Sequence, residues 1–129
     1  MSTPETLYAV IRHVRPLHQY LARAVADELE ETDLTVAMRA VLEQILLAGE
    51  PLTVPRLSQR LWLPRQAVQR VVDAARTLGY VETRPNAGHR RSPLISVTSS
   101  GRDAFDTVHA REMAVLDAVA ATVSPDEAA

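Results

Sequence analysis

The 129-residue sequence contains no cysteine and no lysine. Without cysteine, the chain has no disulfide, thiolate nucleophile, cysteine–zinc site or thiol redox sensor. No apolar run approaches the roughly 18 residues that a bilayer-spanning helix needs. The N-terminus also lacks the basic and apolar regions of a secretory leader. We therefore expect a soluble, cytoplasmic protein with no membrane partner.

Catalytic and metal-binding patterns are missing too. The sequence shows no glycine-rich phosphate loop, no nucleophile elbow and no acid pair in an apolar setting, so we expect no enzyme and no cofactor. Ser99, Ser100 and Gly101 are better explained as a helix cap than as a nucleophile. His13 and His18 are five residues apart, which does not stack them on one helix face, and we predict no metal site.

The net charge of −2 conceals an uneven distribution. Residues 56–91 carry eight arginines and only two acidic residues, whereas acidic residues outnumber arginines on both sides. A basic segment within an acidic chain is a local electrostatic footprint of the kind that nucleic-acid-binding proteins show.

Apolar spacing and turn residues predict five helices and a hairpin. The first helix covers about residues 4–31, and Pro16 is expected to kink or split it. Thr35 caps a second helix that Gly49 ends, Thr53 opens a short third, and a fourth runs from near Pro64 to Gly79. Two strands, 80–84 and 92–98, follow with a turn between them, and residues 98–101 cap a fifth helix. The residues expected to point inward include Leu7, Val10, Ile11, Val14, Val36, Met38, Leu78, Phe105, Met113 and Leu116.

Helix, turn, helix and hairpin in this order form a winged helix, so the predicted fold is mainly α with a small two-stranded β wing. The outer face of the fourth helix carries Arg65, Gln66, Gln69 and Arg70, which suit base edges and phosphates in a major groove. Asp73 lies on the same face and is expected to pair with Arg70 or Arg76. The hairpin adds Arg84, His89, Arg90 and Arg91, which suit the DNA backbone or an adjacent minor groove.

Residues 52–101 closely resemble the helix-turn-helix and wing of the MarR family of bacterial regulators. The resemblance covers about residues 30–122. It rests on a leucine-rich short helix, the Arg–polar–x–Val–polar–Arg pattern of "RQAVQR", a Gly–hydrophobic–Val step, paired wing arginines and a closing Thr-x-x-Gly. It implies a homodimer on near-palindromic double-stranded DNA, mostly as a repressor. Arg65, Gln66, Gln69 and Arg70 then match recognition-helix contacts, and Arg90 and Arg91 match the wing arginines.

The sequence departs from the family pattern in three places. His89 stands where the wing usually has Asp, which would orient a neighbouring arginine. Trp62 stands where Gly is common in the turn. The turn is then expected either to be reshaped or to carry an exposed aromatic residue, although packing in the turn or the core is the more usual role of a tryptophan. The family's last helix, part of the dimer interface, is absent or reduced to "SPDEAA", so dimerisation is expected to depend on the first and fifth helices.

The resemblance also implies a small-molecule effector, often an anionic aromatic compound. His13, Arg15, His18 and Tyr20 are candidate effector-binding residues, although interface packing and exposure to solvent explain them more simply. We expect one domain over residues 1–129: an N-terminal dimerisation helix (1–31), the winged helix-turn-helix (35–98) and a C-terminal dimerisation helix (99–123). Two alternatives remain: a winged helix that binds an acidic protein partner, and a ligand-binding or enzymatic domain without an operator.

Overall fold

The computed structural model describes residues 3–29 and 33–122. Five helices and one hairpin follow each other in the expected order, and the mainly helical winged-helix architecture is confirmed. The "SPDEAA" segment lies outside the described residues. The elements are α1 (Thr3–Leu29), α2 (Val36–Ala48), α3 (Val54–Leu61), α4 (Arg65–Thr77), β1 (Val81–Arg84), β2 (Leu94–Val97) and α5 (Ser99–Thr122).

Short-range capping bonds set most of the helix boundaries, as the sequence predicts. The Thr35 hydroxyl accepts from the Met38 N–H at 3.1 Å, and Thr53 does the same for Arg56. Thr98 accepts from the Gly101 N–H at 3.0 Å at the start of α5. Each bond satisfies one of the N–H groups that the first helical turn leaves open. Gly49 ends α2 in the left-handed conformation, with φ of 70°.

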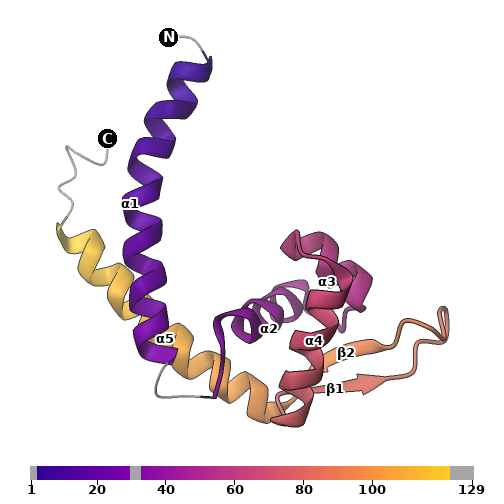
Figure 1. Ribbon diagram of the computed structural model, residues 1–129. Helices are drawn as coiled ribbons and strands as arrows, with labels where there is room; N and C mark the ends of the chain where they lie inside the picture. The colour runs from indigo at the N-terminus through magenta and orange to yellow at the C-terminus, as the bar shows by residue number, and fades with distance from the viewer. Residues whose placement is uncertain (1–2, 30–32, 123–129) are drawn as a thin grey trace.

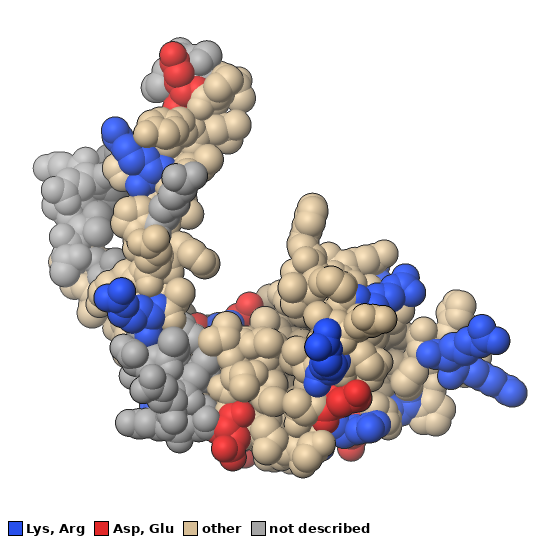
Figure 2. All heavy atoms as spheres, viewed as in Figure 1, with Lys and Arg blue, Asp and Glu red and all other residues tan. Residues whose placement is uncertain are grey.

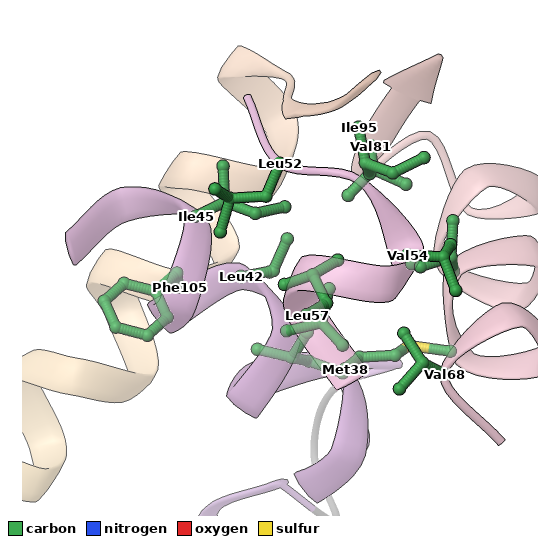
Figure 3. Packing of buried hydrophobic residues seen from close by; sticks show 14 of the residues in the cluster. Met38, Leu42, Ile45, Leu52, Val54, Leu57, Val68, Val81, Ile95 and Phe105 are labelled. Carbon is green, nitrogen blue, oxygen red and sulfur yellow. The ribbon is translucent and has the colours of Figure 1, made fainter. Parts of the chain in front are cut away.

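The hydrophobic core lies in the winged helix (Figure 3). Leu42 of α2, Leu57 of α3 and Val68 of α4 are fully buried and meet between the three helices. Phe105 and Val108 extend the core onto the first half of α5. This packing holds α4 with its apolar stripe inward and its polar side facing solvent.

The two strands pair antiparallel, with Val81 opposite Val97 and Arg84 opposite Leu94. Ile95 of β2 also forms a bridge with Leu52, which precedes α3, through N–O distances of 3.0 and 2.7 Å. Leu52 and Ile95 are both buried. The hairpin is therefore tied to the residues before α3 by backbone bonds, which fixes the base of the wing relative to the helix-turn-helix.

Several predictions about individual residues are wrong. Of the kink or split expected at Pro16, the split is wrong, because α1 is one continuous helix across this residue. Val36, Leu78, Met113 and Leu116 are exposed because their faces turn away from the core of the winged helix. Trp62 does not pack in the turn or the core, since 90% of its surface is exposed, and the alternative of an exposed aromatic residue in the turn is the one confirmed.

α1 and α5 form a pair of long helices beside the winged helix (Figure 1). α1 extends well beyond the winged helix, and the periodic apolar residues in its first half stay exposed: Leu7, Val10, Ile11 and Val14. Their spacing is typical of a helix face, but this face meets no core within the described chain. No helix in the described ranges is long and apolar enough to cross a membrane.

Candidate nucleic-acid interface

The exposed face of α4 carries the four polar residues predicted from the sequence. Arg65, Gln66, Gln69 and Arg70 are exposed, because Val68 and Val72 on the opposite side of the helix enter the core. A helix repeats every 3.6 residues, so burying one stripe of valines leaves the alternate stripe free for a ligand.

Asp73 lies on this face as well, but its partner differs from the prediction. The structure pairs its Oδ1 with the amide Nε2 of Gln69 at 2.9 Å, rather than with Arg70 or Arg76. This (i, i+4) bond orients the Gln69 amide in the free protein. The Asp73 carboxylate thus accepts a hydrogen bond from Gln69, a candidate for contacting base edges.

Asn86 organises the tip of the wing, a role that the sequence analysis missed. Its Nδ2 donates to the Ser92 carbonyl at 3.1 Å, and its Oδ1 accepts from the Gly88 N–H at 3.2 Å. Two backbone hydrogen bonds close the rest of the turn: the His89 N–H donates to the Asn86 carbonyl, and the Ser92 N–H donates to the His89 carbonyl. The wing therefore has a defined tip with His in place of Asp at position 89. The proline–asparagine pair was a signal for this, since asparagine bonds its own turn backbone.

The basic side chains of the hairpin point to solvent. His89, Arg90 and Arg91 are all exposed around this tip. Arg84 is also exposed and lies 3.0 Å from the Glu82 carboxylate. Figure 2 shows basic side chains across the winged helix and out to the hairpin tip, with an acidic group between them.

The wing and the beginning of α4 share one hollowed surface. A hollow of about 270 Å³ is lined by Val54, Pro55, Arg65, Gln66, Gln69, Arg91, Ser92 and Pro93. A second hollow of about 290 Å³ is lined by Thr53, Pro55, Arg65, Asn86, His89 and Ser92. Pro55, Arg65 and Ser92 border both. The fold thus brings α4 and wing residues together, whereas Arg70, Arg84 and Arg90 lie outside the linings.

The N-terminus of α4 opens on this surface without a side-chain cap. Pro64 occupies the N-cap position and makes no capping hydrogen bond. The N–H groups of the first turn therefore keep their partial positive charge for an external acceptor. Arginines, free amides and glutamine side chains at one concave surface suit a phosphate backbone with exposed base edges beside it.

A mostly buried ion pair joins the winged helix to α5. Both carboxylate oxygens of Glu112 on α5 accept from the Arg39 guanidinium on α2, and Glu43 accepts from the same group at 3.0 Å. The guanidinium also lies 5.5 Å from the Phe105 ring. Burial alone lowers the pKa of Arg39, but the hydrogen bonds and charges of Glu112 and Glu43 outweigh it and raise that pKa above its ordinary value. Arg39 therefore stays charged in this site.

The candidate effector residues lie on α1, apart from the hollowed surface. His13, His18 and Tyr20 are exposed, and the Arg15 side chain lies outside the described part of the structure. His109 on α5 stacks on Phe105, with 5.4 Å between ring centroids. Within the described ranges, no three His, Asp or Glu residues are grouped to hold a metal ion.

Comparison with known proteins places the chain in a family. The model of the MarR family matches residues 32–92. An uncharacterized Mycobacterium tuberculosis protein, Rv2011c, is 34% identical over a 117-position alignment that includes 81% of this chain and 82% of the relative. The crystal structure of the MarR family transcription regulator SP03579 is 30% identical, covers 96% of this chain and 82% of its own, and superposes with a TM-score of 0.81. The chain belongs to the MarR family.

More distant MarR structures share the fold. A MarR family protein from Bacillus stearothermophilus, 20% identical, matches 98% of this chain and 88% of its own with a TM-score of 0.82. A mutant of Escherichia coli MarR, solved in complex with operator DNA, is 22% identical and matches 99% of this chain and 91% of its own with a TM-score of 0.76. The MarR assignment confirms the resemblance seen in the sequence, and this chain is a DNA-binding transcription regulator.

Proposed function

We propose that this MarR-family regulator binds a near-palindromic operator as a homodimer, with α4 of each subunit in a major groove and the wing on the adjacent backbone. One observation carries the proposal. The uncapped start of α4, with Arg65, Gln66 and Gln69, borders the same two adjoining hollows as His89 and Arg91 of the wing. Such a surface matches a phosphate backbone and the base edges beside it.

The side chains of this surface have different roles in the proposal. Gln66 and Gln69 pair with base edges, since a glutamine amide suits the donor and acceptor of adenine. The bond from Gln69 to Asp73 leaves the Gln69 carbonyl oxygen and one amide hydrogen for DNA. Arginines supply most of the affinity through phosphates and guanine. The proposed contacts are Arg65, Gln66, Gln69, Arg70, Arg84, His89, Arg90 and Arg91.

The long helices supply the dimer in this proposal. The apolar face of α1, with Leu7, Val10, Ile11 and Val14, is exposed in the single chain, as are Met113 and Leu116 of α5. Such an apolar stripe is costly unless it is covered, and a second copy of the same helices can cover it. Residues 1–31 and 99–123 then act as dimerisation segments and 35–98 as the winged helix. Two-fold symmetry places the half-sites about one helical turn, roughly 10 base pairs, apart.

Repression by occupancy of the operator is the regulatory mode that we propose, in the cytoplasm where the DNA is accessible. A small anionic aromatic effector would then act by binding one arrangement of the two α4 helices more tightly than the other. His13, Arg15, His18 and Tyr20 on α1 are the residues we assign to this effector.

Selection of bound duplexes from a random DNA library tests the proposal. The wild type is compared with Arg90→Ala/Arg91→Ala and with Arg12→Ala/Arg23→Ala, which removes the same charge from α1. The wild type is expected to enrich an inverted repeat. If the dimer contacts ~6–10 phosphates, its affinity falls roughly 10³- to 10⁵-fold between about 50 and 200 mM salt.

The wing variant should bind this repeat more weakly and with a shallower salt slope, while the α1 variant follows the wild type. Absence of any enriched repeat, together with equal retention of DNA by all three proteins, would overturn the proposal. Capture of an acidic protein partner would then be the next experiment.

A further inference from the structure

Trp62 is an exposed aromatic residue in a conformation that side chains rarely adopt. It is 90% exposed, and its φ of 57° makes it the one non-glycine residue with positive φ in the described ranges. Glycine adopts this conformation without strain, whereas a β-carbon makes it unfavourable. Neither packing nor backbone geometry explains a tryptophan here, so its surface is available for a ligand.

Three hydrogen bonds hold the backbone around Trp62. The Trp62 N–H and the Leu63 N–H both donate to the Ser58 carbonyl, the second at 3.2 Å. The Ser58 hydroxyl donates to the Leu63 carbonyl and closes the turn from the other side. These bonds fix the backbone from which the indole projects, so a contact has only the side-chain rotamers of Trp62 left to order.

The electrostatic surroundings of Trp62 favour a polyanion. Residues 51–72 contain four arginines and no acidic residue, and Trp62 lies in the middle of this stretch. Arg60 precedes it by two residues, and Arg65, the first residue of α4, follows it by three. Both are exposed. Trp62 is therefore within three residues of two exposed positive charges and of the uncapped start of α4, so a ligand that covers it meets a basic stretch of the chain.

We propose that Trp62 is a DNA contact, with its ring against the deoxyribose groups of the operator backbone and its Nε1–H donating to a phosphate oxygen. The inference rests on the proposed function, because it places DNA at the start of α4. An indole suits this position, since it offers a large apolar face together with one donor and carries no charge. A neutral contact releases no counterions, so Trp62 contributes affinity without steepening the salt dependence.

The first test uses Trp62 as its own reporter, because it is the only tryptophan in the chain. The probe is the inverted-repeat duplex selected above, labelled with fluorescein. Tryptophan emission and probe anisotropy are recorded in parallel titrations. We expect the emission to change and to saturate at the same DNA concentration as the anisotropy. Binding by anisotropy with unchanged emission would overturn the role of Trp62 and leave the DNA-binding function intact.

The second test compares Trp62→Gly, Trp62→Phe and a control, Leu47→Ala, which alters an exposed apolar residue of α2. Trp62→Gly suits the positive φ, so it should melt at the wild-type temperature or higher. It should nevertheless bind the probe about tenfold more weakly with an unchanged salt slope. Trp62→Phe keeps an aromatic ring but loses the N–H donor, so its affinity for the probe should lie between those of the wild type and Trp62→Gly.

Three outcomes would decide against Trp62 as a DNA contact. Wild-type affinity in folded Trp62→Gly would show that the indole does not contact the DNA. An equal loss in Leu47→Ala would show a general effect of removing apolar surface. Failure of the wild type to bind any selected duplex would overturn the proposed function, and the inference with it.

Discussion

Gly101 occupies a position at the start of α5 where no side chain fits. A β-carbon there would lie 2.1 Å from the Tyr80 carbonyl oxygen and 2.9 Å from its carbon. The same carbonyl accepts the Thr98 N–H at 3.0 Å. The residue before β1 and the first turn of α5 therefore touch backbone to backbone, and this contact fixes where α5 leaves the wing.

Replacing Gly101 with alanine is expected to destabilise the protein by about 2–3 kcal/mol, because backbone atoms on both sides must shift. Ser100→Ala is the matched control, since Ser100 is exposed one residue earlier in the same turn. Urea denaturation, monitored by circular dichroism, measures the free energy of unfolding of both variants. Equal stability of the two variants would show that the contact relaxes without cost.

Among the helices, α2 and α5 are joined by the ion pair between Arg39 and Glu112. Their side chains are only 15% and 14% exposed. Charged groups shielded from water interact more strongly than surface pairs, and losing one of them leaves the other charge without its partner. This pair therefore holds the winged helix at a set position on the long helix that continues towards the proposed dimer interface.

A double-mutant cycle tests that connection. Arg39→Met and Glu112→Met are each expected to lower the free energy of unfolding by about 2–3 kcal/mol. The double variant should lose less than the sum, with a coupling of at least ~1 kcal/mol. Arg84→Ala, which removes the exposed pair with Glu82, should have no measurable effect. Additive losses in the cycle would contradict a direct coupling between α2 and α5.

At the scale of the whole molecule, the apolar face of α1 is exposed in the single chain, whereas the proposed dimer would cover it. Leu7, Val10 and Val14 each expose half or more of their surface. They lie at spacings of three, four and seven residues, so they form one stripe on the helix. A second copy of the chain that covers this stripe would fix the distance between the two α4 helices. This distance sets the spacing of the operator half-sites.

Val10→Glu/Val14→Glu is expected to separate the dimer, because two-fold symmetry would bring new negative charges together in an apolar interface. The dissociation constant of the dimer should rise by at least about 100-fold, and the affinity for the inverted repeat should fall with it. Val36→Glu on α2 is the control, since Val36 is similarly exposed outside this stripe. Sedimentation velocity gives the mass. A monomeric wild type, or a dimeric double variant, would disprove the role of α1.

Much of the fold was predictable because its signals are local. Thr35, Thr53 and Thr98 mark helix starts through bonds to N–H groups three residues away. Gly49 marks a helix end through its own φ. The candidate site was predictable as two separate groups, one on α4 and one on the hairpin, because helix periodicity and turn chemistry each operate within a few residues.

The errors concern residues whose environment depends on distant parts of the chain. Met113 and Leu116 fit the apolar pattern of α5, but the core of the winged helix covers only the first half of that helix. A periodic pattern identifies an apolar face without identifying what covers it. For Trp62 the sequence favoured packing over an exposed aromatic residue because tryptophan usually packs, and its exposure depends on the turn that Ser58 closes.

The sequence by itself determined the order of the elements, the caps that bound them and the concentration of arginine in residues 56–91. Each of these depends on neighbouring residues or on composition alone. Only the tertiary structure decided that Arg65 and Arg91 border one hollow, that Arg39 meets Glu112, and that the stripe on α1 stays uncovered. These features depend on how the packed core and the Leu52–Ile95 bridge place elements far apart in the chain, and no local pattern encodes those distances.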